Sequence, residues 1–345
     1  MLESVPTLLL AAHLLAMNVA SAGPLVAVWL SWRGAGGDLA DQLGGRLLRL
    51  SLVMLVAGSA VGGALVLLPN PALRAALARF PPDAYWFAGT ELLFSAACMA
   101  ALIFGRERFA RRPWLAGAVA LASATNLLYH FPPLMAVLGE LTADPRWTAA
   151  EVLDRRTLLT LWIRPEILSL WIHFILASLA VAPIAALWPG SHSGRESDDG
   201  TDKPVVRRLA AWALAATALQ LPVGLWLLAS TDRDARDAML GQNPAATACF
   251  AGGVLAALWL LQTLTAITLG EGRRSVRRAG WLLIAVTLLM SATLRASREA
   301  TGLAPSNGGA SAVMSAARVG QAFLPDIPGD CQPGKADVRT HPERR

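Results

Sequence analysis

Three histidines and one glutamate are the residues of this chain best suited to chemistry, because each interrupts a long apolar stretch. They are His13, Glu91, His130 and His173. Ionisable side chains are costly in hydrocarbon, and where they occur inside apolar segments they are typical of functional sites. A neutral imidazole can bind iron or zinc, and it can also relay a proton. The chemistry indicated is therefore metal or haem binding, or proton transfer.

The four residues lie at similar depths in their stretches. Each histidine is about eight or nine residues from the same predicted side of a helical bundle, and Glu91 is about six residues from it, so the depths differ by about one helical turn. This spacing predicts one polar layer shared by four helices.

Small and polar residues recur at helical spacing from each candidate, which places them on the same helix face. They are Met17 and Ala20 for His13, Ser95 and Cys98 for Glu91, Ser123 and Asn126 for His130, and Glu166, Ser169 and Ala177 for His173. We expect these faces to point into the bundle. Small neighbours leave room for a flat macrocycle or for close helix packing, and the sequence is compatible with both.

His130 is followed directly by Phe131-Pro132-Pro133. Two prolines remove two helical N–H donors, so the carbonyls of Leu128 and Tyr129 lose their partners and the helix should kink. Such a kink is tolerated at membrane depth where the freed groups find partners or line a cavity. A kink that serves packing alone is the alternative.

Haem ligation is the favoured interpretation of the three histidines, because bundle cores commonly hold such a cofactor between facing helices. Zinc is less favoured, since the sequence has neither His-Glu-x-x-His nor paired cysteines. His130 is the first choice for a sixth ligand and Met290 the second. Arg295 and Arg298 are placed to pair with haem propionates, although binding to lipid phosphate explains them equally well. Hydrogen-bonded packing histidines remain an alternative.

The composition indicates an integral membrane protein. Of 345 residues, 54% are hydrophobic and only 16% are charged, whereas soluble domains are nearer a quarter charged. The net charge of +6 comes from arginines between apolar runs, with no basic tract suited to nucleic acid. The three cysteines have no paired spacing, so neither a disulfide framework nor a zinc pattern is predicted.

About 20 apolar residues cross a bilayer as a helix. By that measure we predict an all-α bundle of about eight transmembrane helices, over residues 5–32, 47–68, 85–104, 114–139, 165–188, 206–229, 246–269 and 279–296. Most Arg and Lys residues fall in the loops after the first, third, fifth and seventh spans, which predicts that these loops are cytoplasmic and that both termini lie outside. The first span lacks the basic residues of a signal peptide, so we expect it to be retained.

The predicted bundle, residues 1–300, is therefore a multi-pass protein of the inner (cytoplasmic) membrane. Residues 301–345 are rich in Pro, Gly, Ser and charge, and we expect a polar, disordered periplasmic tail there.

The order of these features, over about residues 5–230, resembles subunit I of cytochrome bd quinol oxidases. The resemblance is carried by His13 near the start, by Thr90-Glu91-Leu-Leu-Phe-Ser with Gly105-Arg106-Glu107-Arg108 after it, by Ala122-Ser-Ala-Thr-Asn126-Leu127, and by Trp171-Ile-His173-Phe. It implies that His13 and His173 are axial haem ligands and that Glu91 belongs to the haem or proton site.

The chain also departs from that family. The long loop that binds quinol after the sixth helix is replaced by the short segment 230–245, and the Gly-Arg-Gln-Pro-Trp signature is absent. The expectation is a reduced relative with one or two b-type haems that passes electrons between a quinol and a partner such as a periplasmic c-type cytochrome, with a further subunit. A divergent terminal oxidase and a non-redox transporter or structural bundle are the alternatives.

Overall fold

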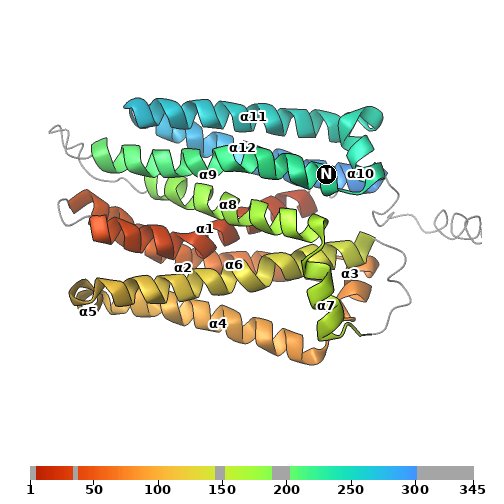
Figure 1. Cartoon of the computed structure of the whole chain (residues 1–345), viewed down its shortest axis with the longest axis horizontal. Coiled ribbons are helices and arrows are strands. Elements are labelled where there is room, and N and C mark those ends of the chain that lie inside the picture. The colour runs from red at the N-terminus through yellow and green to blue at the C-terminus, as the bar shows by residue number, and fades with distance from the viewer. Residues whose placement is uncertain (1–4, 34–37, 144–151, 189–202, 301–345) are drawn as a thin grey trace, which may run out of the picture. The chain divides into compact units, whose positions relative to one another are not determined.

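The computed structural model describes residues 5–33, 38–143, 152–188 and 203–300. Among these residues the ordered elements are all helices and no strand occurs. The long helices lie side by side (Figure 1): α1 (Val5–Arg33), α2 (Asp38–Leu67), α4 (Pro82–Phe104), α6 (Pro113–Ala143), α8 (Pro165–Leu187), α9 (Lys203–Ser230), α11 (Pro244–Leu269) and α12 (Arg273–Ala300). The all-helical prediction is confirmed for these residues.

Seven of the long helices are long and apolar enough to cross a membrane, so the chain is a multi-pass membrane protein. α6 is not among the seven, although it is 31 residues long. Its polar residues and the pair Pro132 and Pro133 lower its apolar character relative to the others. The count of eight spans and the side of the membrane on which each end lies therefore remain predictions. The predicted tail, residues 301–345, lies outside the described residues.

Short helices join the long ones. α3 (Pro71–Leu77), α7 (Arg155–Trp162), α10 (Arg233–Asp237) and η4 (Ala238–Gln242) lie at one end of the bundle, and α5 (Arg106–Arg111) lies at the other (Figure 1). Side-chain caps fix several starts: Asn70, Asp154 and Asn243 accept hydrogen bonds from the amides of Leu73, Thr157 and Ala246. These caps satisfy amides that have no partner within their helix.

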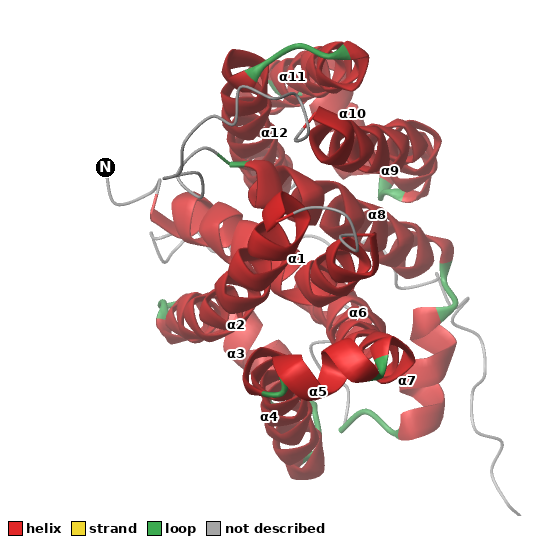
Figure 2. Ribbon diagram, turned by 90° about the vertical axis from the view of Figure 1, so that its left-hand side faces the viewer, coloured by secondary structure: helices red, strands yellow, loops and turns green. Residues whose placement is uncertain are grey.

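α1 is the central helix, packed against α2, α6, α8 and α12 (Figure 2). Glycines let α2 approach α1 closely: a Cβ added at Gly44 would lie 2.8 Å from the carbonyl oxygen of Ala27. A buried hydrogen bond of 2.7 Å from Ser178 Oγ to Asn18 Oδ1 joins α8 to α1. Inside a membrane, small residues and interhelical hydrogen bonds take over much of the role that the hydrophobic effect has in water.

Candidate intramembrane site

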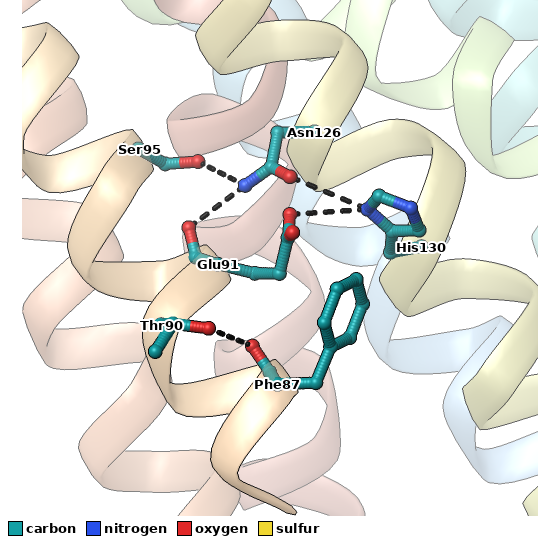
Figure 3. A network of polar contacts seen from close by, with 6 residues as sticks. All are labelled: Phe87, Thr90, Glu91, Ser95, Asn126 and His130. Atoms are coloured by element: carbon teal, nitrogen blue, oxygen red, sulfur yellow. Dashed lines mark hydrogen bonds and ion pairs between the residues drawn. The ribbon is translucent and has the colours of Figure 1, made fainter. Parts of the chain in front are cut away.

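Glu91 on α4 and His130 on α6 meet inside the bundle. Oε2 of Glu91 lies 3.1 Å from Nδ1 of His130, and the side chains are 17% and 27% exposed. Asn126, one turn before His130, completes the network (Figure 3): its Nδ2 donates to the carbonyl of Glu91 at 2.7 Å and to Ser95 Oγ at 2.8 Å, while its Oδ1 lies 3.3 Å from His130 Nδ1. Both neighbours of His130 Nδ1 are acceptors, so this nitrogen is the donor in the network.

Aromatic rings surround His130. Phe87 and Tyr129 contact its ring edge-on, with centroids 5.2 and 5.0 Å away. Tyr129 in turn contacts Trp162 on α7 and Trp171 on α8. The imidazole thus has carboxylate and amide groups at Nδ1 and apolar rings around it.

The proline pair beside His130 has the predicted effect on one carbonyl. Pro132 has no N–H to donate to the carbonyl of Leu128, and Trp171 Nε1 of α8 donates to that oxygen instead, at 2.6 Å. The sequence predicted that the carbonyl would be freed, and the structure supplies its partner. α6 is one helix from Pro113 to Ala143, with both prolines inside it.

His13 on α1 faces α2. Its Nδ1 lies 2.8 Å from the carbonyl oxygen of Gly58, which can only accept, so Nδ1 again carries the proton. The ring also lies against Gly62, where an added Cβ would come within 2.8 Å of His13 Cε1. The imidazole of His13 therefore packs against Gly58 and Gly62 of α2.

His173 on α8 faces α9. Its Nδ1 is buried and has no hydrogen-bond partner among the described residues. Gly224 of α9 lies opposite, where an added Cβ would be 3.8 Å from His173 Cε1. Buried polar nitrogens are nearly always hydrogen-bonded in folded proteins, to protein groups, ligands or ordered water.

Three further residues from the sequence prediction lie on α12. Met290 packs against α11, where a Cβ at Gly253 would lie 3.4 Å from its sulfur. Arg295 Nε donates to Glu299 at 2.6 Å, while its Nη1 is buried and has no hydrogen-bond partner in the described part of the chain. One turn on, Arg298 approaches Gly139 of α6 and interacts with Glu140.

The structure thus brings two of the predicted site residues, Glu91 and His130, into direct contact. His13 and His173 face α2 and α9 instead, and within the described part of the chain no group of three or more His, Cys, Asp or Glu side chains is placed to hold a metal ion. The shared depth of the four residues does not make them one cluster. The sequence did not predict that Trp171 donates a hydrogen bond to the Leu128 carbonyl. The only indication of this contact in the sequence is that Pro132 leaves that carbonyl without its helical donor.

Comparison with known proteins adds no relative: no protein-family model, curated protein or solved structure matches the chain.

Proposed function

We propose that this chain is a membrane b-type cytochrome that passes electrons between a quinol and a redox partner, with haem held by intramembrane histidines. The observation that carries the proposal is the contact that each of His13 and His130 makes through Nδ1. Nδ1 of His13 lies next to the Gly58 carbonyl and Nδ1 of His130 next to the Glu91 carboxylate, so Nε2 is the nitrogen that would bind iron. Histidines that bind metals typically donate their other N–H to such an acceptor, which fixes the ring and raises its basicity.

The residues present fit a haem in two further respects. The unpartnered Nδ1 of His173 and the small Gly224 opposite it are compatible with a ligand at the α8–α9 contact. Arg295 pairs with Glu299 through Nε, and its buried Nη1, which has no partner among the described residues, would be available to a propionate. Because the histidines face different helices, His13, His130 and His173 would hold haem at two sites rather than at one site shared by all three. Met290 is the alternative residue that could bind the iron.

A haem would supply one-electron redox chemistry, and the protein would bind the haem, orient it and shield it from water. The imidazoles would bind and orient the group. The surrounding Leu, Val and aromatic side chains would exclude water and so tune the potential. Glu91 would hold the proton at Nδ1 of His130 and keep Nε2 free.

An optical spectrum of the protein, purified from haem-supplemented cells, tests the proposal. We expect a Soret band, a reduced-minus-oxidised α band typical of b haem, and a positive pyridine haemochrome assay. Substitution His173→Ala or His13→Ala should remove or shift part of these bands, whereas His192→Ala should leave them unchanged because His192 falls in the polar segment between the fifth and sixth predicted spans. A colourless wild-type protein would contradict the proposal. Reduction by added quinol without oxygen tests the electron donor.

The Glu91–His130 contact favours a second candidate function, proton movement through a non-redox transporter. A carboxylate next to an imidazole can exchange a proton at little cost, and such pairs mark proton relays inside membranes. This function predicts a colourless protein that acidifies or alkalinises the lumen of proteoliposomes, and it predicts that Glu91→Gln abolishes the flux.

A further inference from the structure

Arg79 carries a buried charge for which the described residues supply no partner. The residue follows α3 and is 7% exposed, and its Nη1 is fully enclosed. No hydrogen bond or ion pair to its side chain is found among the described residues. Arginine keeps its proton under all ordinary conditions, so it cannot escape the cost of burial by becoming neutral. An anion next to this guanidinium would offset the cost of its burial.

Hydrogen bonds on both sides fix the backbone at Arg79. Its N–H donates to the carbonyl of Ala76 at 3.2 Å, and its carbonyl accepts from the amide of Leu153 at 2.9 Å. Phe80 packs into an apolar cluster with residues of α3, α6, α7 and α8. Arg79 directly follows α3, which lies with α7 at one end of the bundle (Figure 1).

The nearby carboxylates of the described residues do not neutralise Arg79. Glu140 pairs with Arg164 at 3.2 Å. Asp154 caps α7 through the amide of Thr157. Asp83, in the first turn of α4, is exposed and forms no ion pair with Arg79.

The surface next to this segment matches the boundary of a membrane. Leu67 at the end of α2 is 79% exposed, and Trp86 and Tyr85 in the first turns of α4 are 78% and 50% exposed. The hydroxyl of Tyr85 donates to the carbonyl of Leu77 at 2.6 Å, which brings this face to within two residues of Arg79. Tryptophan and tyrosine are enriched at the level of lipid headgroups, and exposed leucine beside them suits acyl chains.

We propose that Arg79 binds the phosphate of an anionic phospholipid whose acyl chains lie along the exposed ends of α2 and α4. A guanidinium presents paired N–H donors that match two oxygens of a phosphate, and these bonds are strong because both partners are charged. The site is independent of haem and of the proposed electron transfer.

The experiment counts phospholipids that remain on the full-length protein, by native mass spectrometry after purification in mild detergent and addition of phosphatidylglycerol. The wild type should retain a lipid that Arg79→Gln binds about ten-fold more weakly, as expected for the loss of one charge-assisted contact. Arg74→Gln is the matched control, because Arg74 lies five residues earlier and is exposed. It should bind as the wild type does.

Further measurements separate the possible sources of the phosphate and guard against misfolding. Inorganic phosphate that stabilises the delipidated wild type as much as the lipid does would assign the site to free phosphate and overturn the lipid. Arg79→Lys keeps the charge and should retain most of the binding if Arg79→Gln does not fold. A wild type that retains no phospholipid, or equal retention by wild type and Arg79→Gln, would overturn the proposal.

Discussion

Nδ1 of His130 lies 3.1 Å from Oε2 of Glu91, and this contact joins α6 to α4 inside a bundle of apolar helices. The carboxylate accepts a hydrogen bond from the imidazole N–H, and the side-chain oxygen of Asn126 is a second acceptor for the same N–H. Neither residue can be removed without leaving the other short of its principal partner. The two should therefore behave as one unit in measurements of stability as well as function.

We predict that Glu91→Ala and His130→Ala each lower the free energy of unfolding by about 1–3 kcal/mol, because each leaves a partly buried polar group unsatisfied. The double variant should be little worse than the worse single variant, which gives a coupling energy of about 1–2 kcal/mol. The measurement is unfolding in mixed detergent micelles. Glu107→Ala is the control, since Glu107 is exposed on the short helix α5. Additive losses would contradict a direct contact.

Trp171 should matter for stability because of one hydrogen bond. Trp171→Phe keeps most of the ring but removes the donor at 2.6 Å from the Leu128 carbonyl, so we expect a loss of about 1–3 kcal/mol. Pro132→Ala restores an N–H that can donate to the same carbonyl within α6, so Trp171→Phe should cost much less in that background. Trp114→Phe, at a position 68% exposed, is the matched control. If Trp171→Phe lowers the free energy of unfolding by the same amount in the Pro132→Ala background, the stabilisation comes from packing of the ring and not from the N–H.

The sequence sufficed to predict the long helices, since about 20 apolar residues in a row leave few other structures in a membrane. It also predicted that Leu128 would lose its helical partner, because that follows from proline chemistry alone. Both predictions rest on local properties of the chain.

The direction in which each histidine faces was not predictable in the same way. The spacing of Ser123, Asn126 and His130 identifies one face of α6, but it does not say that α4 covers this face. His13 and His173 share a depth with that site but face Gly58 and Gly224 on other helices. Depth follows from position in the sequence, whereas the neighbour depends on how all the helices pack. The burial of Arg79, which lies between the predicted spans 47–68 and 85–104, has the same origin.

Asp154 should make the stability of α7 depend on pH. Hydrogen bonds from Thr157, helped by the charge of Arg156, hold the pKa of the Asp154 carboxyl below its usual value. A lowered folded-state pKa means that the stabilisation is present above about pH 4, the usual range for Asp, and is lost as the pH falls through the folded-state value. Asp154→Asn removes the titration but keeps a capping side chain. The difference in Tm between wild type and Asp154→Asn should therefore be constant from pH 7 to 5 and change below pH 4, in favour of the variant. A constant difference down to pH 3 would contradict this role.

The contact between α1 and α2 gives the sharpest paired test, because two adjacent glycines differ in what faces them. A Cβ at Gly62 would lie 2.8 Å from Cε1 of His13, whereas a Cβ at Gly63 would meet no atom within 4 Å. Both substitutions to Ala gain the same helix propensity, up to about 1 kcal/mol. Only Gly62→Ala must displace the imidazole and break its hydrogen bond to Gly58. We therefore expect Gly62→Ala to be less stable than Gly63→Ala by about 1–3 kcal/mol, the usual cost of overpacking.

If His13 binds haem, Gly62→Ala should also shift the reduced-minus-oxidised spectrum while Gly63→Ala leaves it unchanged. Equal stability of the two variants would mean that His13 does not rest on Gly62, and it would remove His13 from the proposed ligands.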